Sequence, residues 1–412
     1  MSSPGNRLDP ARAPWLIAAD TRAVLEALAA GGKPARLVGG CVRDALAGRK
    51  VTDIDIATPE TPQRVIELLT AAGLKAVPTG IEHGTVTAVV RGRPFEVTTL
   101  RRDVTTDGRH AVVAFTDDWE EDASRRDFTM NALSADPDGL VHDFFDGAAD
   151  LAAGRVRFVG EPQARIREDV LRILRFFRFH AHYGKGIPDV GGLAACRELA
   201  PLLPRLSAER VAIELFKLLK APDAASTIGL MGEAGILAPT LAELSDIERL
   251  RGLQRLDEPA ARDPLLRLAA LLPDRPETAR NVAERLRLSN ADRERLVAVA
   301  GPSTMYWPVR DERGLRRSLH RLGAQTMRDL GLLALARGEA ALGQPALAAA
   351  QVWQPVSLPV KGQDALDLGV PAGKRVGELI GAVERWWEEG DYRADRAACL
   401  VQLKSLVGKT TV

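Results

Sequence analysis

The hydrophobic pattern of this chain changes once, near residue 165, and this change limits the folds that the chain can adopt. Before it, short apolar and β-branched runs such as "ARLVGG" and "TDIDIAT" alternate with helical segments such as "TPQRVIELLTAAG". After it, helical segments of about 10 to 20 residues follow one another, beginning with "ARIREDVLRILRFFRFHAHYG". Because 412 residues exceed one ordinary core, we predict an α/β first part and an all-α second part.

The end of the α/β part contains a predicted hairpin and a predicted loop. Residues 85–100, "TVTAVVRGRPFEVTTL", have the alternation of two strands around the turn Arg91-Gly92-Arg93-Pro94. Residues 101–124 show no sustained period and contain an Asp-Gly turn signal, so we expect a mobile loop there.

Two aspartates stand one residue apart in "TDIDIAT". In a strand, Asp53 and Asp55 share one face, about 6–7 Å apart, while Ile54 and Ile56 point to a core. Two carboxylates this close repel one another unless a cation lies between them, and Mg²⁺ prefers oxygen ligands. An isolated D-x-D is more often a solvated acidic face, so the surrounding sequence decides.

The surrounding sequence supplies further groups of a metal and triphosphate site. About 12 residues earlier, a strand-like run ends at Gly39-Gly40 and a helix begins, which lets backbone N–H groups approach phosphate oxygens; Arg43 can reach the same phosphates. Glu96 is a lone acid in a predicted strand and can act as the third carboxylate of a phosphoryl-transfer site. The alternative for Glu96 is an exposed edge-strand acid.

A second pair of charged residues, Asp169 and Arg172, is three residues apart in a predicted helix, where both lie on one face. The alternative is an ordinary helical ion pair. Cytosine and adenine each present an amino donor beside a ring-nitrogen acceptor, whereas guanine and uracil present the reverse. A carboxylate that accepts and a guanidinium that donates therefore suit C and A. Glu168 and Arg175 have the spacing to orient Arg172.

Three motifs carry a family resemblance. In order, "LVGGCVRDALAGRKVTDIDIAT", "SRRDFTMNAL" and "REDVLRILRFFRF" resemble the class II branch of the nucleotidyltransferase superfamily, the CCA-adding enzymes and bacterial poly(A) polymerases, over roughly residues 35–220. The resemblance implies an α+β fold: a polymerase-β-like nucleotidyltransferase head (a mixed sheet with flanking helices), then an all-α neck, body and tail. We expect the head at 15–150, a base-recognising neck at 151–222, and a tRNA-binding body and tail at 223–412.

The resemblance also assigns roles by position. It implies that Asp53 and Asp55 bind metal and act with Glu96 in catalysis. It implies triphosphate binding by Gly39, Gly40 and Arg43, and ribose or nucleotide binding by Arg125, Arg126, Asp127 and Asn131. It implies base recognition by Asp169, Arg172, Glu168, Arg175 and Arg178.

The implied reaction is template-independent transfer of CMP and AMP from CTP and ATP to the 3′ end of tRNA, with Mg²⁺ and release of pyrophosphate. A poly(A) polymerase shares every motif and remains an alternative. A non-catalytic RNA-binding homologue is the alternative of another class, and the intact acidic pair, Gly-Gly and R-R-D argue against it. The segment "DGRHAVVAF" and the long helical part favour CCA addition, since both suit an enzyme that measures tRNA.

The remaining signals limit partners and location. The chain has 56 Lys plus Arg against 55 Asp plus Glu, so any surface that binds nucleic acid must be local. One predicted helix has the spacing of basic residues to hold an RNA backbone, at Arg313, Arg316, Arg317 and Arg321. A solvated helix face is an equal alternative for these four arginines. Three separated cysteines exclude a zinc cluster and favour the cytoplasm. We find no signal peptide and no long apolar run, so we expect no export, no membrane span and no stable protein partner.

Overall fold

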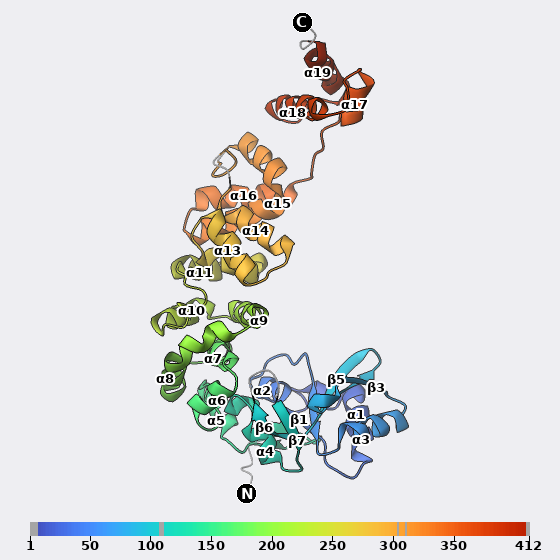
Figure 1. Cartoon of the computed structure of the whole chain (residues 1–412), viewed down its shortest axis with the longest axis vertical. Coiled ribbons are helices and arrows are strands. Elements are labelled where there is room, and N and C mark those ends of the chain that lie inside the picture. Colours follow the sequence, from blue (N-terminus) through green and yellow to red (C-terminus); the bar gives the residue numbers. More distant parts are fainter. Residues whose placement is uncertain (1–6, 107–110, 303–304, 310, 409–412) are drawn as a thin grey trace. The chain divides into compact units, whose positions relative to one another are not determined.

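The computed structural model describes residues 7–106, 111–302, 305–309 and 311–408, with the side chains of 103–106 and 111–113 left out. The chain forms two compact units, Met1–Ala242 and Glu243–Val412. Figure 1 shows the sheet and the first helices in one unit and helices alone in the other. The expected boundary between neck and body at residue 222 differs from this division, so the domain limits stay predictions.

The first unit contains a seven-stranded mixed sheet of order β3-β4-β5-β2-β1-β8-β9. Its strands are β1 (Arg36–Val38), β2 (Asp55–Thr58), β3 (Lys75–Gly80), β4 (Thr85–Val90), β5 (Arg93–Thr99), β8 (Ser134–Ala135) and β9 (Val141–His142). Strands β2 and β5 pair in parallel, and the other neighbours pair antiparallel. The predicted hairpin is confirmed, since β4 and β5 pair around Arg91 and Gly92. The mixed sheet of the predicted α+β fold is confirmed as well.

Helices α1 (Ala19–Ala29) and α3 (Pro62–Ala71) contact each other and strand β4. Their apolar faces meet the sheet in a core that includes Ile54 and Ile56, which are 2% and 0% exposed. The two isoleucines of "TDIDIAT" thus anchor β2 as predicted, and this places the neighbouring carboxylates away from the core. Burial of each such side chain stabilises the fold by about 2 kcal/mol.

The prediction of a mobile loop at residues 101–124 is wrong for the part of this segment that the structure describes. Strands β6 (Arg101–Thr106) and β7 (Ala111–Phe115) pair antiparallel, and helix α4 (Trp119–Ser124) follows. The register shifts between Asp103 and Thr105. This irregularity interrupts the alternation, which is why the sequence shows no sustained period. The Asp-Gly turn signal at residues 107–108 lies outside the described residues.

Five helices complete the first unit: α6 (Pro162–Glu168), α7 (Leu171–Tyr183), α8 (Val190–Leu199), α9 (Ala208–Leu219) and α10 (Ala224–Glu233), after the short α5 (Gly147–Ala153). The continuous helix expected from residue 164 is broken, because Asp169 has extended backbone angles (φ −149°, ψ 105°). Aromatic rings join the R-R-D segment to α7: the ring of Phe128 is tilted against that of Phe158 at 4.9 Å, and the ring of Phe158 stacks on that of Phe176 at 5.6 Å.

The second unit is all-α over its described residues, as predicted. Its helices are α11 (Ile247–Gln254), α12 (Pro264–Leu271), α13 (Pro276–Arg285), α14 (Asn290–Ala300), α15 (Glu312–Ala336), α16 (Ala340–Val352), α17 (Gly362–Asp367), α18 (Lys374–Glu389) and α19 (Arg396–Gly408). A separate small core around Val383 and Trp387 joins the last three. Helix α15 changes direction at Gly323, whose φ of 82° suits glycine.

The arginines predicted to hold tRNA lie on the first half of α15 and pair with the end of α18 and its following turn. Arg316 meets Asp391 at 2.8 Å, and Arg317 and Arg321 meet Glu388 at 3.0 and 2.7 Å. Arg313 donates to the carbonyl of Glu389. Carboxylates therefore pair with three of these arginines within the unit, and tRNA binding through the four arginines stays a prediction.

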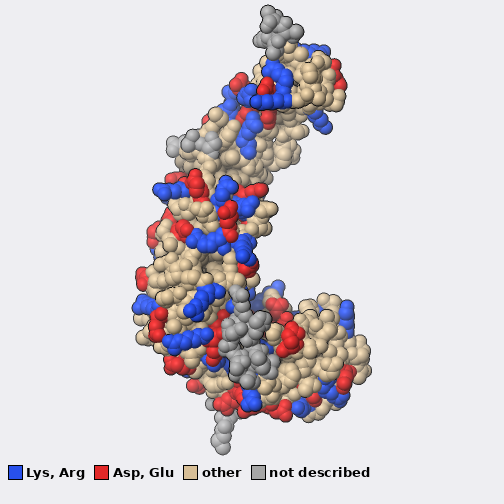
Figure 2. Space-filling view, in the orientation of Figure 1, with Lys and Arg blue, Asp and Glu red and all other residues tan. Residues whose placement is uncertain are grey.

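The distribution of charged side chains agrees with the nearly balanced numbers of basic and acidic residues in the sequence. On the face drawn in Figure 2, basic and acidic side chains are interspersed, with no coat of one sign. No helix in the described part of the chain is long and apolar enough to cross a membrane.

Candidate active site

A cleft of about 440 Å³ in the first unit gathers most of the predicted site residues. It is lined by Gly39, Gly40, Arg43, Asp55, Arg125, Arg126, Asp127, Asn131, Asp169, Leu171, Arg172, Arg175, Phe179 and Arg210. Residues far apart in the sequence thus meet in one place. Four residues predicted for catalysis or nucleotide binding do not line the cleft: Asp53, Glu96, Glu168 and Arg178.

The acidic residues lie at the start of β2. Asp55 opens this strand, and Glu96 is its direct neighbour on the parallel strand β5. Asp53 precedes the strand and is exposed, whereas Asp55 is partly buried. Glu96 is exposed too, but on an interior strand of the sheet and not on an edge. The edge-strand alternative for Glu96 is therefore wrong.

Asp55 is partly buried and has the carboxylates of Glu96 and Asp53 nearby. Burial, and then the negative charges of Glu96 and Asp53, raise the pKa of Asp55 to about 6, although Arg126 acts in the opposite direction. A divalent cation would remove this repulsion, and carboxylate oxygens are suitable ligands. In the described residues, no group of three or more Asp, Glu, His or Cys side chains is already gathered as a metal site. Metal binding by the aspartate pair and a direct role of Glu96 therefore both stay predictions.

The Gly-Gly junction lies beside the acids. Strand β1 ends at Val38, Gly39 has a φ of 68°, and α2 (Gly40–Leu46) begins at once. Glycine is favoured by this backbone angle, and a Cβ on Gly39 would also lie 3.0 Å from Nη1 of Arg126, so that side chain would have to shift slightly. Arg43 follows within the first turn of α2, and its Nη1 donates to Oδ1 of Asn131 at 2.6 Å. The strand-to-helix junction was predicted from the sequence and is confirmed.

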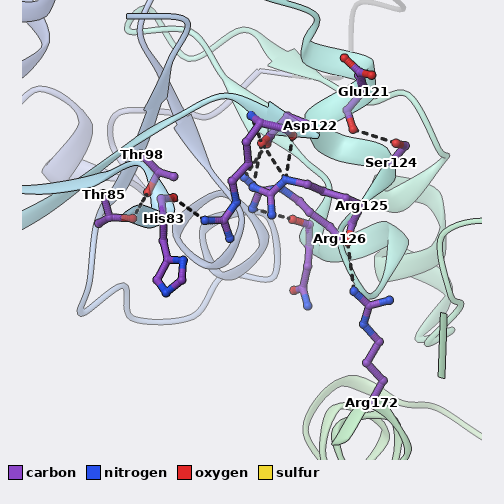
Figure 3. Close-up of polar contacts among 11 residues, drawn as sticks. His83, Thr85, Thr98, Glu121, Asp122, Ser124, Arg125, Arg126 and Arg172 are labelled. Carbon is purple, nitrogen blue, oxygen red and sulfur yellow. Dashed lines mark hydrogen bonds and ion pairs between the residues drawn. The ribbon is translucent and has the colours of Figure 1, made fainter. Parts of the chain in front are cut away.

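The two arginines of the R-R-D motif converge on Asp122, a residue that sequence reasoning missed (Figure 3). Nε and Nη2 of Arg125 donate to Oδ1 of Asp122 at 3.0 and 2.8 Å, and Nη2 of Arg126 donates to its Oδ2 at 3.2 Å. Burial would raise the pKa of Asp122, but the charges of Arg126 and Arg125 outweigh it and lower that pKa. Asp122 stands three residues before Arg125 and four before Arg126, and this helical spacing was the sequence signal that could have indicated the contact.

Replacing Asp122 by Asn should lower the free energy of unfolding at pH 7 by about 3 kcal/mol, because two partly buried guanidinium groups lose their counter-charge. The pKa of Asp122 is depressed in the folded state, so its stabilisation is present above about pH 4 and is lost as pH falls through the folded pKa. Urea unfolding of both proteins at pH 7 and at pH 3 measures this. Glu67→Gln, which breaks an exposed ion pair with Arg64, is the matched control and should cost less than about 0.5 kcal/mol. Equal stability of wild type and Asp122→Asn at pH 7 would contradict the argument.

Asp127, the acid of R-R-D, links this motif to helix α7. Its Oδ1 accepts from Nδ2 of Asn131 at 2.9 Å, and its Oδ2 accepts from Nε of Arg175 at 2.7 Å. Burial would raise the pKa of Asp127, but Arg175 and these hydrogen bonds outweigh it and lower that pKa. Asp127 and Asn131 are thus engaged within the protein, and their contact with a nucleotide stays a prediction.

Asp169 and Arg172 both line the cleft, but they do not form the helical ion pair that was the alternative. Asp169 lies in the break between α6 and α7, and its Oδ2 accepts from Nη2 of Arg210 at 2.7 Å. Arg172 donates from Nη1 to Oε2 of Glu168 at 2.7 Å and from Nη2 to the carbonyl of Arg125 at 3.2 Å (Figure 3). Each member of the pair is held by a different partner. Both side chains therefore line the cleft without pairing with each other.

The supporting residues differ in part from those expected. Glu168 does contact Arg172, as its spacing predicted. Arg175 does not orient Arg172, because it binds Asp127 instead. Arg178 also has a different partner, since its Nε lies 2.6 Å from the buried Glu214. The sequence analysis did not identify Arg210 and Glu214. They stand four residues apart on the amphipathic helix α9, and in the sequence they show only as part of the polar face of that helix.

Comparison with known proteins places this site in a family. Residues 35–157 match the family described as the Poly A polymerase head domain, and residues 193–247 match the one described as the probable RNA and SrmB-binding site of polymerase A. The mitochondrial CCA tRNA nucleotidyltransferase 1 of Mus musculus is 36% identical over 387 residues, which is 90% of this chain and 86% of the mouse protein. The chain belongs to the CCA tRNA nucleotidyltransferase family.

Other members of the CCA tRNA nucleotidyltransferase family support this placement. The CCA-adding enzyme of Streptococcus gordonii is 45% identical over 204 residues, covering 48% of this chain and 49% of that protein. A crystal structure of the Bacillus stearothermophilus CCA-adding enzyme in complex with CTP is 28% identical, covers 95% of this chain and 98% of that one, and has a TM-score of 0.79. The fold predicted from the resemblance is therefore confirmed along nearly the whole chain.

Proposed function

We infer that this protein is a CCA-adding enzyme, which transfers CMP and AMP from CTP and ATP to the 3′ end of tRNA without a nucleic-acid template and releases pyrophosphate. The observation that carries this conclusion is the similarity to a CCA tRNA nucleotidyltransferase over 90% of the chain. The head alone is shared with poly(A) polymerases. The relatives that extend through the helical part are named for CCA addition, and this favours that activity over poly(A) synthesis.

The cleft has the size and polarity that a nucleotide needs. Its volume of about 440 Å³ falls in the range of small-molecule sites. We propose that Arg43 and the Gly39-Gly40 junction bind the triphosphate, and that Arg125 and Arg126, held by Asp122, bind the ribose and phosphate region. This arrangement neutralises phosphate charge with cations that are already oriented, so little reorganisation is needed during transfer.

Base selection is proposed to lie at Asp169 and Arg172. A guanidinium has only donors and a carboxylate only acceptors, so the pair matches the ring nitrogen and the amino group of C or A. Glu168 fixes Arg172 by an ion pair at 2.7 Å, and Arg210 meets Asp169 at the same distance. A site whose buried polar groups are matched by only two bases discriminates against the others by roughly 10⁴-fold. One preorganised pair thus accounts for two accepted nucleotides.

We propose that Asp53 and Asp55 hold Mg²⁺. The partial burial of Asp55 beside other carboxylates and the hard oxygen donors fit this ion. When bound, the ion would stabilise charge on the transferred phosphoryl group and lower the pKa of the attacking 3′ hydroxyl. The protein itself orients the triphosphate and holds the nucleotide base.

Domain limits and location complete the proposal. We propose the head at 15–150, the neck at 151–222 and the body and tail at 223–412. We propose the cytoplasm as the compartment, since the three cysteines are buried and free of disulfides.

The experiment that tests the function is incubation with tRNA lacking its 3′ CCA, with each nucleoside triphosphate singly and in mixtures, resolved on a sequencing gel. CTP alone should add C residues only, CTP with ATP should complete CCA and then stop, and UTP or GTP should add almost nothing. Long A tracts with ATP alone would indicate a poly(A) polymerase, and no extension would indicate a non-catalytic homologue.

A further inference from the structure

Tyr183, at the end of helix α7, reaches the helix that carries Arg43. Its hydroxyl donates to Oδ1 of Asp44 at 2.6 Å. Asp44 also accepts from Nε and Nη2 of Arg43, each at 3.0 Å. One carboxylate therefore joins the phenol of α7 to the guanidinium of α2. Hydrogen bonds to a charged acceptor are stronger than those between neutral groups.

The ring of Tyr183 contacts the same guanidinium directly. Cζ of Arg43 lies 4.6 Å from the centroid of the Tyr183 ring and 5.1 Å from that of Phe179. Together with the hydrogen bond to Asn131, these contacts leave only 11% of the Arg43 side chain exposed. Arg43 is thus held where it lines the cleft, with Nη2 about 3.7 Å from the position that a Cβ on Gly40 would take.

The protonation state of Tyr183 suits this role. Burial raises its pKa, and the hydrogen bond to Asp44 acts in the same direction, although Arg43 opposes both. The phenol therefore remains a donor across the pH range in which a nucleotidyltransferase works.

Helix α7 carries groups for both ends of a nucleotide. Its first turn presents Arg172, the proposed base reader, and its last residue is Tyr183. A rigid helix of 13 residues thus links base recognition to the position of Arg43. A substrate that is a nucleoside triphosphate needs both ends aligned at once.

We propose that Tyr183 is a positioning residue, which acts through Asp44 to fix Arg43 against the triphosphate of CTP and ATP alike. This inference rests on the proposed function of the cleft. It concerns the phosphate end of the substrate and not the base. Loss of the hydroxyl should therefore weaken binding of both substrates equally and leave base selection unchanged.

The test is Tyr183→Phe, which removes the hydroxyl and keeps the ring. We expect KM for CTP and for ATP to rise by about threefold to tenfold, less than the full effect of one hydrogen bond to a charged group because the hydroxyl acts indirectly through Asp44, with kcat within about twofold of wild type. The inhibition constant of inorganic pyrophosphate should rise by the same factor, and the preference over UTP should stay the same. Asp44→Asn, a second variant of the same link, should give the same pattern.

A merely structural role is separated by a double mutant and a control. In an Arg43→Ala background, Tyr183→Phe should cause no further rise in KM, because its effect passes through Arg43. Tyr392→Phe is the matched control, since that hydroxyl is buried without a hydrogen-bond partner among the described residues, and it should leave KM unchanged.

Two results would overturn the inference: unchanged KM and pyrophosphate inhibition in Tyr183→Phe, or an equal additional loss in the Arg43→Ala background. A wild-type protein that fails to extend tRNA would instead overturn the proposed function. The two failures are therefore distinguishable.

Discussion

Asp55→Asn should reduce kcat for nucleotide addition by about 10³-fold or more while tRNA affinity stays within about twofold of wild type. The structure places Asp55 partly buried at the start of β2, with Glu96 beside it and Asp53 two residues earlier. A metal bound by Asp53 and Asp55 would stabilise charge that develops in the transition state, so the mutation should affect the rate and not the complex with tRNA. Asp53→Asn should give the same result. Single-turnover extension of tRNA measures the rate, and filter binding measures the affinity.

A second measurement tests the metal site without relying on activity. Mg²⁺ should raise the unfolding temperature of wild type, because it relieves repulsion between the carboxylates, and should do so much less for Asp55→Asn. The exposed Glu67→Gln on α3 is the control and should respond to Mg²⁺ as wild type does. Activity of Asp55→Asn within about tenfold of wild type would overturn the site assignment.

The parts of the site that the sequence predicted are those coded by local pattern. The Gly39-Gly40 junction follows a short strand, and the acids of "TDIDIAT" alternate with buried isoleucines. These features depend on periodicity and on the special backbone freedom of glycine, both of which are visible in a few residues. The mixed order of the sheet followed from the family resemblance and not from the pattern.

The parts that the sequence did not predict depend on contacts between distant segments. No Pro or Gly marks the helix break at Asp169, and the break is stabilised by Arg210 from a helix about 40 residues later. Arg175 has the spacing to support Arg172, yet it binds Asp127, because the tertiary fold brings a buried carboxylate closer. The β6–β7 pair was missed because its register shift removes the alternation that identifies strands.

The unexpected positions of Asp169 and Arg172 sharpen the prediction about base choice. If the two formed one ion pair, a mutation of either would mainly change helix stability. Since Arg172 is held by Glu168 and Asp169 by Arg210, each keeps its orientation when the other is removed. The two roles in base recognition can therefore be tested separately.

Asp169→Ala should lower kcat/KM for CTP and ATP, by a factor that corresponds to a loss of about 1–3 kcal/mol of transition-state stabilisation. It should also sharply reduce the preference for these substrates over UTP and GTP. The mutation removes the acceptor for the amino group of C or A, whereas Arg172 can still donate to a carbonyl. Arg172→Ala should impair both correct substrates without improving UTP, since the donor is lost. Incorporation kinetics with each of the four nucleoside triphosphates measure these effects.

The controls for this pair come from neighbouring helices. Arg167→Ala and Glu198→Ala break an exposed ion pair between α6 and α8, at 61% and 54% side-chain exposure, and should leave selectivity unchanged. Metal-dependent stabilisation and tRNA affinity should survive both Asp169→Ala and Arg172→Ala, because neither residue is placed at the acidic pair. Wild-type selectivity in Asp169→Ala would mean that base choice is made elsewhere in the cleft, which Arg210 and Arg175 also line.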